Sequence, residues 1–255
     1  MHPLLMSSLS WVEYRDRLQD DLIVLIPCGA LEQHGPHLPL GTDALLSAAV
    51  AQSVAELVNG IVAPTLSYGY KSQPKSGGGQ HFPGTTSLDG NTLSQMIRDV
   101  IRELARQGAA KLVVIDGHYE NQWFLTEGID LALRDVGAGS NLQIMRLEYW
   151  DFLTESTLTQ VFPDGFPGYA LEHAAVIETS LMLHYHPELV RLHLIPDDKP
   201  ANFPPYDLYP PKLDWVPPSG VLSSAKTANA EKGKLMATQI AAQIAEAIAQ
   251  EFQSG

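Results

Sequence analysis

The sequence has few of the features that mark secreted or membrane-spanning proteins. Its one cysteine, Cys28, rules out a disulfide within the chain and fits a reducing compartment. No apolar run reaches the roughly 18 residues that a membrane span needs. The first ten residues have neither the basic start nor the long apolar core of a secretory signal. We therefore expect a cytoplasmic protein with no membrane partner.

Positive charge is also scarce. The chain has 16 lysines and arginines against 29 aspartates and glutamates, a formal net charge of −13. Because a nucleic-acid backbone attracts basic surfaces, we expect no nucleic-acid partner and a small substrate that is neutral or cationic. Hydrophobic residues make up 45% of the 255 residues, enough to bury the core of one large domain or of two small ones.

Buried strands and amphipathic helices are what the chain has in quantity. Apolar runs predict strands at residues 22–26, 61–66, 111–115 and 142–147. Helical spacing predicts helices at residues 9–18, 43–58, 88–107, 121–135, 171–184 and 228–252. Strands that alternate with helices predict an α/β fold, a three-layer α/β/α arrangement around a mainly parallel sheet. In such sheets the active site lies beyond the carboxyl ends of the strands.

Two segments have no regular pattern. Residues 68–86 are rich in glycine and polar side chains, which is typical of a functional or disordered loop. Residues 186–220 hold half of the chain's 18 prolines, which predicts an extended arm. Its aromatic residues include Tyr209 and Trp215. Such an arm could contact other subunits or fold over its own domain.

Potential metal ligands follow two of the predicted strands. Glu32, His34 and Asp43 come after the first strand, and His118 and Glu120 come after the third. In extended backbone, residues i and i+2 point to the same side, so each Glu/His pair can face one space. Together these groups would hold two divalent ions with Asp43 as a bridge. Histidines mixed with carboxylates favour Zn²⁺ or Mn²⁺ over a structural thiolate zinc site.

Simpler interpretations exist for each residue taken alone. Glu32 and His34 fit a surface loop, and Glu120 fits a helix start favoured by the helix dipole. A cytidine-deaminase interpretation fails because no Pro-Cys-x-x-Cys follows. By default, Cys28 is a buried small hydrophobe and His173 a structural histidine. His173 and Glu178 are five residues apart, so they face one pocket only if the helix begins after His173.

Five longer motifs are spread along the chain. They are GALEQHG at 29–35, YGYKSQPKSGGGQHFPGTTSLDG at 68–90, GHYEN at 117–121, EHAAVIETSLML at 172–183 and GVLSSAKTANAEKGK at 220–234. Together they resemble the creatininase (creatinine amidohydrolase) family over nearly the whole chain. GALEQHG is shared widely in that family, whereas the KSGGG and SSAKT segments are similar to creatininase proper.

The resemblance implies a hydrolase that opens a cyclic amide, most simply creatinine to creatine, with a hydroxide that bridges two metal ions. It implies Glu32 and His118 as ligands of one ion, His34 and Glu120 as ligands of the second, and Asp43 as the bridge. It also implies a single domain over residues 1–255 and a homohexamer.

The resemblance further implies roles for residues outside the metal ligands. Ser76 and Tyr119 match positions that contact the substrate, and Trp150 matches an aromatic wall of the pocket. His173 matches a histidine that holds the substrate and moves protons, while Glu178 and Glu120 match functional carboxylates.

One pair of positions departs from creatininase proper. Where that enzyme has Trp-Asp on the loop over the substrate, this chain has Tyr169 and Ala170. Tyr169 can still stack on a flat ring, but Ala170 cannot form the hydrogen bonds of an aspartate. A different small lactam, formamide or guanidino compound is therefore an alternative substrate, and a binding protein without turnover is a third possibility.

Overall fold

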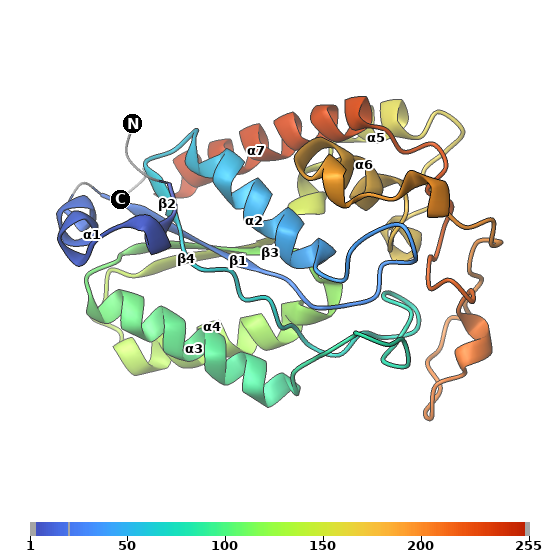
Figure 1. Ribbon diagram of the computed structural model, residues 1–255. Helices are drawn as coiled ribbons and strands as arrows, with labels where there is room; N and C mark the ends of the chain where they lie inside the picture. Colours follow the sequence, from blue (N-terminus) through green and yellow to red (C-terminus); the bar gives the residue numbers. More distant parts are fainter. Residues whose placement is uncertain (1–3, 20, 253–255) are drawn as a thin grey trace.

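A parallel sheet of four strands forms the centre of the molecule (Figure 1). The computed structural model describes residues 4–19 and 21–252. The strands are β1 (Ile23–Cys28), β2 (Gly60–Val62), β3 (Lys111–Asp116) and β4 (Gln143–Glu148), in the order β2-β1-β3-β4. Cys28 pairs with Asp116 and Asp116 with Glu148, so β1, β3 and β4 end level with one another. The loops after these strands therefore emerge at one edge.

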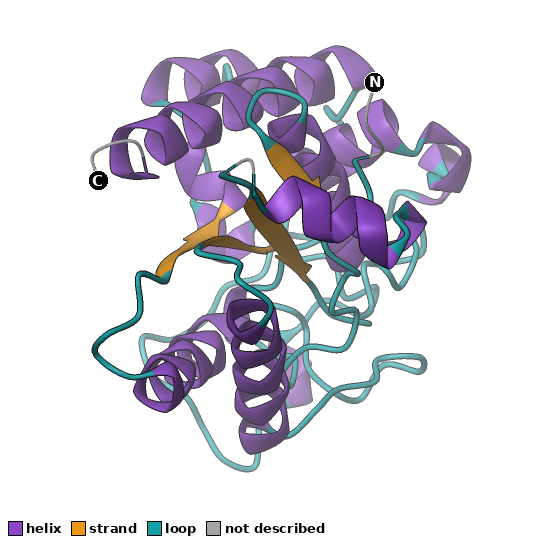
Figure 2. Ribbon diagram, turned by 90° about the vertical axis from the view of Figure 1, so that its left-hand side faces the viewer, coloured by secondary structure: helices purple, strands orange, loops and turns teal. Residues whose placement is uncertain are grey.

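Helices cover both faces of this sheet (Figures 1 and 2). One layer contains α2 (Thr42–Ala55), α6 (Val176–Tyr185) and α7 (Ala230–Phe252), with the short α5 (Glu155–Val161) beside α7. The other layer contains α3 (Gly90–Arg106) and α4 (Gln122–Val136). Helix α1 (Trp11–Leu18) lies at the edge of the molecule. The predicted three-layer α/β/α fold with a parallel sheet is confirmed.

Alternating side chains of the central strands explain the two layers. Val24 and Ile26 of β1 pack into the core beneath α3, whereas Leu25 packs into the core beneath α2 and α7. All three are fully buried. A strand buried on both faces has no polar alternation, which is why the sequence shows a continuous apolar run there.

Several predicted boundaries were wrong. The second strand ends at Val62 rather than at residue 66, because Pro64 has no N–H to donate to a ladder. The helix predicted at 171–184 begins at Val176, since Ala174 adopts a left-handed backbone (φ 55°). Helix α2 ends at Ala55 rather than at residue 58, and α5 was not predicted.

The proline-rich arm at residues 186–220 contains only three short 3-10 turns, Pro187–Leu189, Leu192–Leu194 and Leu213–Trp215. Lys75 Nζ lies 3.3 Å from Asp207 Oδ1, which ties the glycine-rich loop to the arm. The arm therefore folds over its own domain, whatever other contacts it makes. Within the described residues, no helix combines the length and apolarity needed to cross a membrane.

Candidate two-metal site

Three groups of potential metal ligands meet beyond the carboxyl ends of β1 and β3. Among the described residues, the groups are Glu32–Asp43–His118, His34–Asp43–Glu178 and Glu32–His34–His173, and within each group the ligand atoms lie within 4.8 Å of one another. Glu32, His34 and Asp43 each belong to two of them. Asp43 has one oxygen beside His34 and the other beside His118, as expected for a bridging carboxylate. The structure thus brings together Glu32, His34 and Asp43 after β1 with His118 after β3, from segments that the level strand ends place side by side.

The first group is centred on His118. Its Nδ1 lies 3.0 Å from Glu32 Oε2 and 3.0 Å from Asp43 Oδ2. Its Nε2 lies 3.0 Å from the carbonyl oxygen of Tyr70. If Nε2 carries the hydrogen and donates to Tyr70, Nδ1 presents a lone pair to the carboxylates. A second-shell carbonyl that fixes the tautomer in this way is the usual arrangement for a metal-binding histidine.

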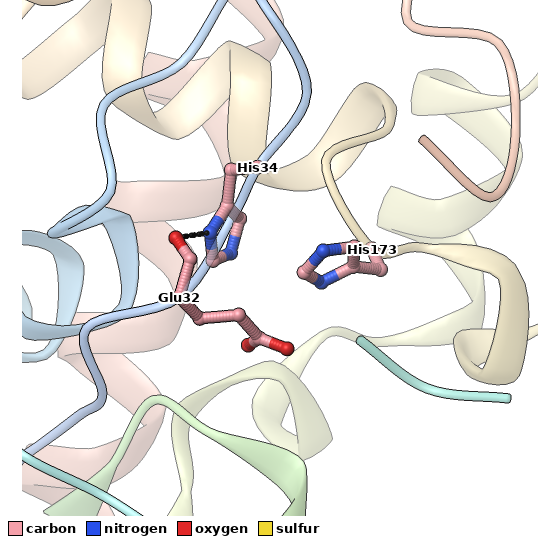
Figure 3. Close-up of side chains that lie close together, drawn as sticks. All are labelled: Glu32, His34 and His173. Carbon is pink, nitrogen blue, oxygen red and sulfur yellow. Dashed lines mark hydrogen bonds between the residues drawn. The ribbon is translucent and has the colours of Figure 1, made fainter. Parts of the chain in front are cut away.

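The second group is centred on His34. Its Nε2 lies 2.9 Å from Asp43 Oδ1 and 3.5 Å from Glu178 Oε1. Its Nδ1 lies 3.1 Å from the carbonyl oxygen of Glu32, the contact that is drawn in Figure 3. That carbonyl accepts a hydrogen bond from Nδ1–H, so Nε2 directs its lone pair towards the two carboxylates.

Glu120 has a different position from the one that the family resemblance implied. Its Oε2 lies 3.4 Å from His118 Nε2, on the side of the ring away from Glu32 and Asp43. Its Oε1 accepts hydrogen bonds from the backbone N–H of Gln73 (2.8 Å) and the hydroxyl of Ser76 (2.5 Å). The structure therefore places Glu178, rather than Glu120, beside His34.

The charges and unpaired atoms of this cluster fit divalent cations. Glu32 Oε1, His34 Nε2 and Asp43 Oδ2 are buried and make no hydrogen bond. Burial raises the pKa of Glu32 to about 7; His118 lowers that pKa, whereas Glu120 and Asp43 raise it. Buried carboxylates without a cation are costly, and bound metal ions would relieve that cost.

His173 reaches the cluster from the opposite side (Figure 3). Its ring centroid lies 4.4 Å from that of His34. Because α6 begins only at Val176, His173 is outside the helix, which removes the constraint that kept His173 and Glu178 from facing one pocket. The backbone N–H of Ala174 donates to Glu178 Oε2 (2.5 Å), so the same turn orients both residues.

A cavity of about 690 Å³ opens above the cluster. The residues predicted to contact substrate all line it, namely Ser76, Tyr119, Trp150, Tyr169 and His173, and so does Ala170. The hydroxyl of Tyr169 donates to the carbonyl of Trp150 (3.1 Å), which joins two walls of the cavity.

Sequence reasoning missed several residues of this site. Leu208, Tyr209 and Trp215 of the proline-rich arm line the cavity, as do Tyr149 and Glu172. The arm's aromatic composition was a signal that it had a role, but no local pattern could place it. Burial raises the pKa of Glu172 to about 8, although the N–H groups of Ile177 and Val176 lower it.

The comparisons with known proteins agree with this geometry. The family model described as creatininase, creatinine amidohydrolase, matches residues 7–248. The creatinine amidohydrolase of Pseudomonas putida is 51% identical over 248 residues, which cover 96% of this chain and 95% of that protein. A crystal structure of creatinine amidohydrolase superposes with a TM-score of 0.98 at 48% identity and covers all of both chains.

Other solved creatininase structures contain metal ions or creatine. At a TM-score of 0.96, a manganese form and a substituted form with bound creatine are each 49% identical and cover 98% of this chain and 99% of theirs. A substituted Zn–Zn form, also at 0.96, is 48% identical and covers 99% of both chains. From the family model and the identity to the P. putida enzyme, the chain belongs to the creatininase family.

Proposed function

We propose that this protein hydrolyses creatinine to creatine with two divalent metal ions. The observation that carries the proposal is the pair of ligand groups that share Asp43 at the base of the cavity. The P. putida relative, which is 51% identical, is a creatinine amidohydrolase. Opening the cyclic amide requires a C–N bond to break after water adds to the carbonyl carbon, and two-metal sites suit that chemistry.

Glu32, Asp43 and His118 would hold one ion, and His34, Asp43 and Glu178 would hold the second. This assignment differs from the sequence-based one only in that Glu178 replaces Glu120, because of their positions relative to His34. Zn²⁺ or Mn²⁺ suits a donor set of imidazoles and carboxylates. Such ions supply Lewis acidity and lower the pKa of a bound water towards neutrality.

Side chains around the metal centre would handle the substrate. Ser76 and Tyr119 would contact it, and Trp150 with Tyr169 would form the flat apolar walls that suit a planar ring. Glu120, which accepts a hydrogen bond from Ser76, would help to move a proton. His173 would deliver a proton to the ring nitrogen as it leaves, which is general acid catalysis.

The experiment is creatine formation from creatinine by purified protein, with Zn²⁺ or Mn²⁺ added after chelation and dialysis. We expect turnover only with added metal. A panel of other lactams, formamides and guanidino compounds run in parallel tests the alternative substrates. Faster turnover of one of these than of creatinine would make it the native substrate, and no turnover of any would contradict the proposal.

We further propose that the protein acts in the cytoplasm as a homo-oligomer, most simply a homohexamer. The single buried Cys28 is consistent with a reducing compartment. Size-exclusion chromatography with light scattering measures the assembly, and a mass other than six chains would contradict the hexamer.

A further inference from the structure

Gln33 separates two of the proposed metal ligands in the sequence, but its own side chain contacts other loops. The side chain is buried, and its Nε2 donates to the carbonyl oxygens of Gly77 and Gly220, each at 3.0 Å. Its Oε1 accepts from the N–H of Gly35 (2.9 Å). One amide thus joins the loop after β1, the glycine-rich loop and the end of the proline-rich arm.

Glycine allows this close approach. A Cβ at Gly220 would lie 2.1 Å from Gln33 Oε1, and Gly220 has a positive φ of 81° that side chains rarely adopt. The backbone at this point is therefore shaped around the Gln33 amide.

The ring of His173 meets the same residue. His173 Nε2 lies 2.8 Å from the backbone carbonyl oxygen of Gln33 and 2.8 Å from the side-chain Nε2 of Gln33. A primary amide nitrogen has two hydrogens, and the carbonyls of Gly77 and Gly220 take both. The Gln33 amide therefore has no hydrogen left to donate to His173. If His173 Nε2 carried no hydrogen, its lone pair would point at the lone pairs of the Gln33 backbone carbonyl oxygen, which is repulsive. His173 Nε2 must therefore carry a hydrogen and donate it to that carbonyl.

The orientation of the amide does not change this result. If Gln33 were flipped, its oxygen would face the oxygens of Gly77 and Gly220, and its nitrogen would face the N–H of Gly35. All three contacts would be repulsive, so the flip is excluded by its neighbours. Even in that orientation, the atom beside His173 Nε2 would be an acceptor, and Nε2 would still donate.

We propose that Gln33 is a positioning residue that holds His173 with its proton on Nε2, so that Nδ1 is the nitrogen that exchanges a proton with the substrate. A neutral imidazole has one N–H, so Nδ1 begins the cycle bare. The inference rests on the proposed function. As the C–O bond forms, Nδ1 takes the proton of the attacking water. As the C–N bond breaks, Nδ1 gives that proton to the leaving nitrogen.

Neutron diffraction from zinc-loaded crystals soaked in D₂O at neutral pH tests the tautomer directly. We expect deuterium on Nε2 of His173 and none on Nδ1. Deuterium on Nδ1, with or without a second one on Nε2, would overturn the proposal. The result does not depend on which substrate the enzyme turns over.

A variant tests the role of the amide. Gln33→Met keeps the side-chain length but removes the amide, and Gln80→Met is the control, because Gln80 is exposed and bonds only to Ser87 among the described hydrogen bonds. We expect Gln33→Met to bind two equivalents of metal with a nearly unchanged KM. Its kcat should fall at least ~10-fold, because the Gln33 backbone carbonyl that accepts from His173 is then no longer held in place by the contacts of the amide with Gly35, Gly77 and Gly220.

A kcat for Gln33→Met equal to that of Gln80→Met would overturn the proposal. If Gln33→Met does not fold, the deuterium position in the wild-type crystal still decides which nitrogen of His173 carries the proton. Wild-type protein that fails to hydrolyse creatinine would contradict the proposed function instead, while the deuterium position would still test Gln33.

Discussion

His118 donates through Nε2 to the carbonyl oxygen of Tyr70 at 3.0 Å, and this contact turns Nδ1 towards Glu32 and Asp43. The backbone of Tyr70 is itself held, because the N–H of the same residue donates to Asn121 Oδ1 (2.8 Å). A fully buried asparagine therefore helps to orient a proposed metal ligand through the Tyr70 backbone.

The first prediction concerns Asn121→Ala. Asn121 Nδ2 also donates to Gly29 O (3.1 Å) and Asp116 Oδ1 (3.0 Å). The change therefore removes the partner of the Tyr70 N–H and of the Gly29 carbonyl, and one of the two hydrogen bonds to Asp116 Oδ1, which keeps the His118 N–H. We expect the free energy of unfolding to fall by about 2–4 kcal/mol, since each buried unpaired group costs roughly 1–3 kcal/mol. Urea denaturation measures this loss.

Asn121→Ala should also weaken metal binding. Outer-shell partners of metal ligands are typically worth about 10–100-fold in affinity, and chelator competition measures this. Asn91→Ala, an exposed position on α3, is the control and should change neither quantity. Wild-type metal affinity in Asn121→Ala would mean that the Tyr70 carbonyl is held without Asn121.

The second prediction is that His118→Ala loses one metal ion and nearly all activity. His118 Nδ1 is the only nitrogen donor in the Glu32–Asp43–His118 group. Because outer-shell changes alone cost about 10–100-fold, loss of a ligand should lower kcat/KM by more than ~100-fold. Elemental analysis of the dialysed variant should give one equivalent per chain, and two full equivalents would show that the ligand assignment is wrong.

The third prediction concerns the cavity wall. Ala170 lines the cavity and is exposed to it, beside Tyr169. An aspartate there would offer a charged hydrogen-bond acceptor, worth about 1.5–3 kcal/mol, so Ala170→Asp should raise kcat/KM for creatinine about 10-fold or more. Ala138→Asp, in an exposed turn, controls for the added charge. No gain would argue for a native substrate other than creatinine.

The fourth prediction is a pH dependence of stability. Burial raises the pKa of Glu172 to about 8, so the folded protein keeps this proton while the unfolded chain loses it at an ordinary carboxyl pKa near 4.5. The contribution of Glu172 to stability is complete below about pH 4.5 and is lost as the pH rises to about 8, by up to ~1.4 kcal/mol per pH unit.

In the wild type, the N–H of Ile177 donates to Glu172 Oε2 at 2.8 Å. Glu172→Gln keeps an oxygen that can accept this hydrogen bond but has no titratable proton. Its free energy of unfolding, from urea titrations between pH 5 and pH 8, should fall less steeply than that of the wild type. Glu127→Gln, on the exposed side of α4, should follow the wild type. Parallel curves for Glu172→Gln and wild type would mean that Glu172 is ionised in the folded protein.

Much of the fold and of the site could be predicted from local patterns. The apolar runs at β1 and β3 and the helices between strands gave the parallel sheet, because burial on both faces leaves a continuous hydrophobic signature. The sequence alone also showed Glu32, His34 and Asp43 after one predicted strand and His118 and Glu120 after another. Level strand ends then brought these segments together, as parallel topology requires.

What local patterns could not supply were the contacts between remote segments. Glu178 stands beside His34 because a left-handed Ala174 delays the start of α6, a backbone choice that sequence periodicity does not register. Gln33 reaches His173 and two glycine carbonyls only where three loops pack together. The sequence by itself determined which chemical groups the strand ends carry. Tertiary packing decided which of them touch, because hydrogen bonds between remote residues depend on how the layers fit and not on neighbours in the chain.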